Sequence, residues 1–107
     1  MKKTITNVEQ FKTEFIKMNR TEQFSQDGLE VLYEWLTELD METGEETELD
    51  VIALCCEFTE YKGIEELKEN YTEIKNIQDL LDKTHVIFID NIYDVEDGNG
   101  RFIIQDF

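Results

Sequence analysis

Between Thr21 and Tyr61 the chain has no Lys, Arg or His, although half of its 26 acidic residues lie there. The thirteen acids of this stretch are Glu22, Asp27, Glu30, Glu34, Glu38, Asp40, Glu42, Glu45, Glu46, Glu48, Asp50, Glu57 and Glu60. Like charges at this density destabilise a compact state. A stretch that keeps these charges either attracts a cationic partner through its negative electrostatic field or serves solubility.

The remainder of the chain limits how the acidic stretch can fold. The protein has 107 residues and a formal net charge of −16, and 40% of its residues are hydrophobic. This apolar content is high enough for a packed core, and the length is typical of one domain. We therefore expect residues 1–107 to form a single acidic α+β domain.

The charge balance also restricts the partners. Direct binding of nucleic acid depends on Lys and Arg, and so does binding to anionic membranes. The acidic chain instead favours a basic partner, such as a protein groove that normally holds DNA or RNA. The longest apolar run, from Val51 to Cys56, is too short to span a membrane. The first five residues lack the apolar region of a signal peptide, so we expect a cytoplasmic protein.

Helical periodicity is clearest in the N-terminal half. Residues 7–19 suggest a first helix with Asn7 as its N-cap. A second helix is expected from Gln26 to Thr43, capped by Ser25 and ended by Gly44. Its apolar residues lie on one face at a period of 3.6 residues, and they are Leu29, Leu32, Tyr33, Leu36 and Leu39.

The C-terminal half reads as strands and short helices. The apolar run Leu49–Phe58 suits a buried strand, although a buried helix is an alternative. Short helices are expected around residues 64–71 and 77–81. Strands are expected at His85–Asp90 and Arg101–Asp106, joined by a hairpin turn at residues 97–100. The predicted fold is α+β, with two N-terminal helices packed on a sheet of about three strands in the order α-α-β-α-α-β-β.

The second helix carries the strongest candidate site. Its acids recur every four residues and form one ridge, made of Glu30, Glu34, Glu38 and Glu42, with Asp27 in the first turn. Asp27 to Glu42 spans roughly 22 Å of helix axis. Each like-charge pair at this spacing costs roughly 0.2–0.5 kcal/mol, and no Lys relieves it. The ridge is either a plain solvated face or a mimic of phosphates along a nucleic-acid strand.

Two apolar residues flank this ridge. Trp35 lies at the border between the leucine face and the ridge, where it is either an interface anchor or a core-edge residue. Val31 lies within the acidic side of the helix and is a candidate exposed apolar contact. The full set of candidate partner-binding residues is Asp27, Glu30, Glu34, Trp35, Glu38, Glu42, Glu45, Glu46, Glu57 and Glu60.

Catalytic and metal sites have little support in the sequence. The turn Asp97-Gly98-Asn99-Gly100 resembles the middle of a calcium loop, but Val95 stands where the first ligand is needed. His85 is the single histidine, and only a fold that brings Cys55 or Cys56 to it would make a nucleophile–base pair. Both cysteines are expected to be free thiols. We expect no enzyme activity, cofactor or metal.

Two segments carry a resemblance to known proteins. Residues 48–61 (Glu-Leu-Asp-Val-Ile-Ala-Leu-Cys-Cys-Glu-Phe-Thr-Glu-Tyr) and 102–107 (Phe-Ile-Ile-Gln-Asp-Phe) resemble segments of small acidic proteins of phages and mobile elements. The acid-rich helices are more weakly similar to those of ArdA-type antirestriction proteins, which are DNA mimics. The resemblance implies a phage context in a bacterial host cell. It implies no settled activity by itself. Because phage proteins of this size and charge include inhibitors of restriction enzymes and of CRISPR–Cas nucleases, it favours an inhibitor.

These observations together predict a non-enzymatic inhibitor of a host defence nuclease. Its acidic surface would occupy a basic DNA- or RNA-binding groove of a host protein, with no direct contact to nucleic acid or membrane. The alternative is a protein–protein interaction module or phage regulator whose acidity serves solubility. A homodimer with one longer acidic surface is compatible with either function.

Overall fold

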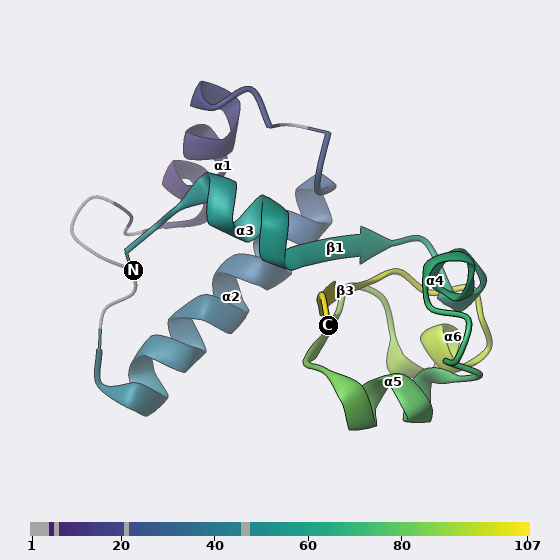
Figure 1. Cartoon of the computed structure of the whole chain (residues 1–107). Helices are drawn as coiled ribbons and strands as arrows, with labels where there is room; N and C mark the ends of the chain where they lie inside the picture. The colour runs from purple at the N-terminus through teal and green to yellow at the C-terminus, as the bar shows by residue number, and fades with distance from the viewer. Residues whose placement is uncertain (1–4, 6, 21, 46–47) are drawn as a thin grey trace. The chain divides into compact units, whose positions relative to one another are not determined.

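The computed structural model describes residue 5 and residues 7–20, 22–45 and 48–107 (Figure 1). Residues 1–4, which were considered for a signal peptide, and the candidate site residue Glu46 lie outside this set. The fold is α+β and has two compact units, one ending at Cys56 and the other beginning at Glu57. No helix among the described residues is long and apolar enough to cross a membrane.

The first unit consists of helices. Helix α1 runs from Val8 to Lys17, α2 from Gln26 to Thr43 and α3 from Val51 to Glu57, the residue at which the second unit begins. Helices α1 and α2 pack against each other. The rings of Phe11 and Phe15 are fully buried, and Phe11 also contacts Tyr33 of α2 at 5.4 Å between ring centroids.

The ends of α2 are where the sequence predicts them. The Ser25 side chain accepts a hydrogen bond from the backbone N–H of Gly28 at 3.0 Å, which satisfies one of the free donors of the first turn. Gly44 ends the helix with φ of 71°, a left-handed conformation that costs a residue with a Cβ about 1–2 kcal/mol. Local capping therefore fixes both boundaries of α2.

The leucine face of α2 is buried only in part. Leu29, Leu32 and Leu36 lie in the core as predicted, whereas Leu39 is 37% exposed near the C-terminal end of the helix. Ile52 and Leu54, which lie in the interval predicted as a strand, belong to α3 and not to a sheet. Leu54 is buried, but Ile52 is 38% exposed.

The predicted strand over residues 49–58 is wrong for most of its length. Its helical part, α3, begins where the Asp50 carboxylate accepts a hydrogen bond from the Ala53 N–H at 3.0 Å. Strand β1, Phe58–Tyr61, follows it directly. A short apolar run fits a buried strand and a helix about equally well, and the local Asp50 contact favours the helix.

The second unit contains a three-stranded antiparallel sheet in the order β1-β3-β2. Strand β2 is Val86–Phe88 and the central strand β3 is Phe102–Gln105. Phe102, Ile103 and Ile104 of β3 are all fully buried. Because side chains alternate between the faces of a strand, both faces of the sheet are covered at its centre.

Three short helices supply the rest of the second core. They are α4 (Ile64–Asn70), α5 (Ile77–Lys83) and α6 (Ile92–Glu96). Together with the sheet they form one buried cluster, made of Tyr61, Ile64, Leu67, Ile74, Ile77, Leu80, Val95, Phe102 and Ile104.

The predicted hairpin turn at residues 97–100 is wrong, although β2 and β3 do pair. The connection between them contains α6, and Gly98 donates its N–H to the carbonyl of Val95 at the end of that helix. Gly100 is needed for a different reason. A Cβ added at Gly100 would lie 2.6 Å from the backbone nitrogen of Val95, so only glycine allows this close approach.

Side-chain hydrogen bonds hold the end of β3 in place. Asp106 accepts hydrogen bonds from the Thr59 hydroxyl at 2.7 Å and from the Tyr71 hydroxyl at 3.0 Å. The Tyr71 ring also stacks on Phe107 with centroids 4.5 Å apart. Burial is the main cause of the raised pKa of Tyr71, and the hydrogen bond to Asp106 raises this pKa further. These contacts tie β3 to β1 and to the residue that follows α4.

Candidate functional site

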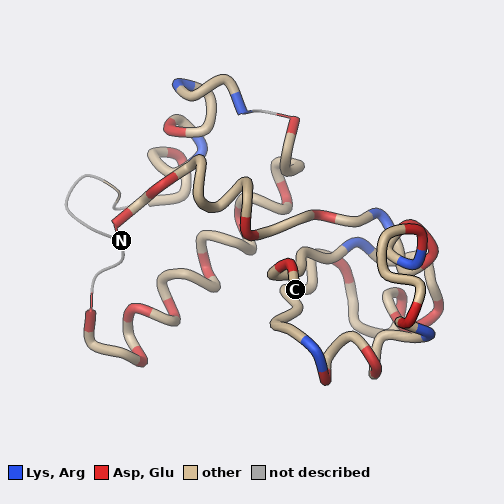
Figure 2. The backbone as a smooth tube through the Cα atoms, viewed as in Figure 1, with Lys and Arg blue, Asp and Glu red and all other residues tan. Residues whose placement is uncertain are grey.

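The acidic ridge of α2 lies in solvent along the whole helix. Acidic positions recur along α2 in Figure 2, and no basic residue interrupts them. The exposed members are Asp27, Glu30, Glu34, Glu38 and Glu42, and Glu45 is exposed just past the end of the helix. The ridge thus presents carboxylates on successive turns of one well-capped element.

The structure supplies a countercharge that the sequence stretch lacks. Lys12 of α1 forms an ion pair with Glu30 at 3.2 Å, and the Lys12 side chain is only 11% exposed. Sequence reasoning missed this pair because the two residues lie 18 positions apart and meet only when α1 packs on α2. Within the described chain, neither Lys nor Arg pairs with Glu34, Glu38 or Glu42. The uncompensated part of the ridge therefore begins at Glu34.

The apolar neighbours of the ridge are only partly covered. Trp35 and Val31 are both half-buried, so each keeps part of its side chain in solvent and neither is a fully exposed contact. The most exposed large apolar side chain of α2 is Met41, at 83%. Its position off the leucine face, two residues after Leu39, was the available signal in the sequence.

The remaining candidates belong to the second unit. Glu57 is exposed, and its backbone carbonyl accepts a hydrogen bond from the Asp106 N–H at 2.7 Å. Glu60 is half-buried on β1. Tyr61 is a core residue, and its hydroxyl accepts a hydrogen bond from the Asn70 amide at 3.3 Å. These residues of the second unit are therefore not part of the acidic ridge on α2.

A hollow of about 430 Å³ lies beside the ridge, where α1 meets α2. Its lining combines two apolar side chains, Val8 and Tyr33, with the carboxylates of Glu30 and Glu34. The Tyr33 ring is held in place by its contact with Phe11. The arrangement offers an aromatic surface next to negative charge, which is the chemistry that recognises an organic cation.

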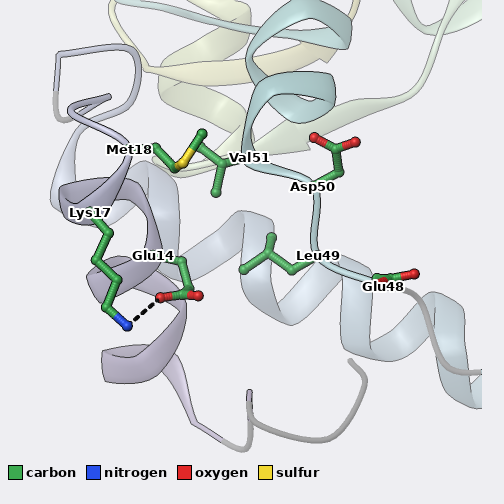
Figure 3. A pocket seen from close by; sticks show the side chains of 7 residues that line it. All are labelled: Glu14, Lys17, Met18, Glu48, Leu49, Asp50 and Val51. Carbon is green, nitrogen blue, oxygen red and sulfur yellow. Dashed lines mark ion pairs between the residues drawn. The ribbon is translucent and has the colours of Figure 1, made fainter.

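A second hollow of about 660 Å³ lies between the end of α1 and residues 48–51 (Figure 3). Its acids do not converge on a common point. Glu14 is already paired with Lys17 at 3.1 Å, whereas the carboxylates of Glu48 and Asp50 point away from that pair. Exposed carboxylates that point apart cannot share one bound cation, so this hollow is a weaker candidate.

Thiol and metal chemistry find little support in the geometry. Burial raises the pKa of Cys55, an effect that Arg20 offsets in part, and a raised pKa disfavours the reactive thiolate. Cys55 and Cys56 are free thiols, as predicted, but Cys56 is exposed rather than part of the core. No group of three or more His, Cys, Asp or Glu residues placed to hold a metal ion occurs in the part of the chain that the structure describes.

Comparison with known proteins gives no further guide to function. No family model matches the chain, and neither a curated protein nor a solved structure is significantly similar to it. The resemblance to phage and antirestriction proteins therefore stays a prediction, and the exposed carboxylates of α2 are the structural basis for a proposed function.

Proposed function

We propose that the protein inhibits a host defence nuclease, of the restriction or CRISPR–Cas class, by nucleic-acid mimicry. The acidic ridge would occupy a basic groove that otherwise holds DNA or RNA. The carboxylates of Glu34, Glu38 and Glu42 carry this proposal, because they are exposed on successive turns and have no Lys or Arg partner in the described chain.

The spacing of these carboxylates supports mimicry over a merely solvated face. One helical turn separates neighbouring carboxylates, and residues four apart have Cβ atoms about 6 Å from each other. A helix selected only for stability gains from Lys at these positions, whereas α2 has none. The ridge keeps an unfavourable charge pattern that a row of Lys and Arg in a nucleic-acid groove would relieve.

The mechanism would be competition at the groove. Ion pairs between the ridge and the partner's Lys and Arg replace the pairs that those residues make with phosphates. Binding through such ion pairs releases counterions into solution. It weakens as salt increases, because the free energy gained from that release becomes smaller. About one copy of the inhibitor would be needed for each nuclease site, since the complex blocks the groove and catalyses nothing.

Cleavage assays on a panel of purified restriction and Cas nucleases test the proposal. For a sensitive nuclease, cleavage should fall to baseline near one inhibitor per site, and pre-bound DNA or guide RNA should slow the loss. Binding should weaken steeply with NaCl. A complex that stays intact at saturating nucleic acid would exclude mimicry.

Charge reversal then identifies the surface. The double change Glu34→Lys and Glu38→Lys should abolish inhibition while leaving the fold intact, because both side chains are exposed. The contacts of positions 34 and 38 with Glu30 and Glu42 become attractive while the contact between the two introduced lysines stays repulsive, so α2 should gain a few tenths of a kcal/mol in all. Loss of inhibition with a gain in stability is not expected of a plain solvated face.

A matched control comes from α4. Glu66→Lys with Glu69→Lys makes the same change in net charge at two exposed sites and leaves the ion pair between Glu65 and Lys68 in place. This variant should inhibit nearly as well as the wild type. If the two double variants lose inhibition equally, total charge and not the ridge of α2 is responsible.

A second candidate function is an interaction module that binds through apolar contacts. The observation in its favour is the exposure of Met41 and Leu39 at the C-terminal end of α2. In this case Met41→Glu should abolish binding, and added salt should change the affinity little.

A further inference from the structure

The hollow between α1 and α2 differs from the rest of the acidic ridge. Glu38 and Glu42 lie on the open surface of α2, whereas Glu34 lines a concave site together with Tyr33 and Val8. Its volume of about 430 Å³ falls within the range of roughly 300–1,000 Å³ that is typical of ligand sites. The hollow therefore adds a concave shape to the charge of the ridge.

The chain already holds one cation next to this hollow. The Lys12 ammonium lies 3.2 Å from Glu30, and most of the Lys12 side chain is covered. Glu30 is thus largely neutralised from within the protein. Glu34, one turn further along α2, lines the same hollow and has no such partner among the described residues.

We propose that this hollow receives an arginine side chain of a partner protein. The inference rests on the proposed function, and it names the residue type that the groove of the nuclease would contribute. The Glu34 carboxylate would pair with the guanidinium, the Tyr33 ring would pack on it, and Val8 would contact the aliphatic stem. Charge complementarity selects a cation, and the aromatic and apolar lining selects one that carries a flat head on a hydrocarbon stem.

Arginine fits this lining better than lysine does. A guanidinium is planar and weakly hydrated, so it stacks on an aromatic ring and donates two parallel hydrogen bonds to one carboxylate. A lysine ammonium is compact and strongly hydrated, and it would gain little from Tyr33. Glu38 and Glu42 do not line this hollow, so they should discriminate less between the two side chains.

Titration of the full-length protein with two short peptides, one rich in arginine and the other in lysine, tests the inference. The readouts are the affinity and the NMR signals of the Tyr33 ring. The arginine peptide should bind more tightly and shift the Tyr33 signals. Equal affinities with unshifted Tyr33 signals would overturn the proposal.

Two pairs of variants separate the hollow from general charge. Glu34→Gln and Glu38→Gln remove one charge each, but only Glu34 lines the hollow. The first should weaken arginine-peptide binding roughly tenfold, the size expected for a charge-assisted hydrogen bond. The second should weaken it by no more than about twofold, because an ion pair with an exposed carboxylate outside the hollow contributes little to binding. Equal losses would overturn the proposal.

The second pair uses the lysines of α1. Lys12→Met releases Glu30 into the hollow, whereas Lys17→Met removes the same charge from the exposed pair with Glu14. The first should tighten arginine-peptide binding and the second should change it little, with circular dichroism used to verify that both variants fold. Equal tightening by both would assign the effect to net charge alone and would count against the hollow.

The results of these peptide experiments can be told apart from a failure of the proposed function. If the hollow selects arginine but no nuclease is inhibited, the function fails and the site remains. If a nuclease is inhibited through Glu34 and Glu38 equally, mimicry stands and the arginine site is wrong.

Discussion

At the scale of single residues, two ion pairs have different structural roles. Lys12 neutralises one member of the acidic ridge, as described above. Asp90 and Arg101 instead join the chain at the two ends of the connection between β2 and β3. The Asp90 carboxylate accepts hydrogen bonds from the backbone N–H of Arg101 at 2.8 Å and from its guanidinium at 3.0 Å. These contacts hold the pKa of Asp90 below its ordinary value of 3.8.

Replacing Asp90 by Asn should therefore destabilise the protein in a pH-dependent way. Because its pKa is lower in the folded state than in the unfolded state, Asp90 stabilises the fold above pH of about 4, and this contribution is lost as the pH falls through the folded value. The free energy of unfolding of Asp90→Asn, measured in urea, should lie below that of the wild type at pH 7. The two should converge in acid, and a constant difference would contradict the role of the charge.

At the scale of elements, local chemistry explains which predictions were correct. The boundaries of α2 follow from Ser25 and Gly44, both of which act within one turn of the helix end. The interval Leu49–Phe58 has one local signal, the Asp50 cap at the start of α3, but the change to strand β1 depends on pairing with β3. Sequence patterns therefore predicted capped elements well and the short apolar run poorly.

For the candidate site too, the sequence predicted the features that depend on one helix and not those that depend on packing between helices. Exposure of Glu34, Glu38 and Glu42 was predictable, because they lie opposite a leucine stripe on one helix. The pair between Lys12 and Glu30 and the hollow beside it were not predictable. Both depend on how α1 packs against α2, and periodicity within one helix carries no information about that packing.

The close approach of Gly100 to the backbone of Val95 leaves no room for a side chain in the connection between β2 and β3. Gly100→Ala should destabilise the second unit by roughly 1–3 kcal/mol, because the added methyl group would meet the backbone of α6 at Val95. Chemical denaturation measures the change in the free energy of unfolding. If Gly100→Ala were as stable as the wild type, the close approach would be wrong.

At the scale of the whole molecule, the net charge of −16 sets the response to salt. Repulsion among surface acids opposes the compact state, and dissolved ions screen it. The free energy of unfolding in urea should therefore rise between about 0.01 M and about 1 M NaCl, as the Debye length falls from roughly 30 Å to roughly 3 Å. Binding to a basic partner should move in the opposite direction. Stability that falls with added salt would show that attractive pairs such as Lys12–Glu30 outweigh the repulsion.

The position of β3 has a consequence for the order in which the second unit forms. Strand β3 lies at the centre of the sheet, yet it follows every other element in the chain. During synthesis, β1 and β2 emerge from the ribosome with no partner and must wait for residues 102–105. Pairing of β1 with β3 also closes a loop of some forty residues, and such long-range contacts slow folding. The helices of the first unit can form while residues 102–105 are still being synthesised.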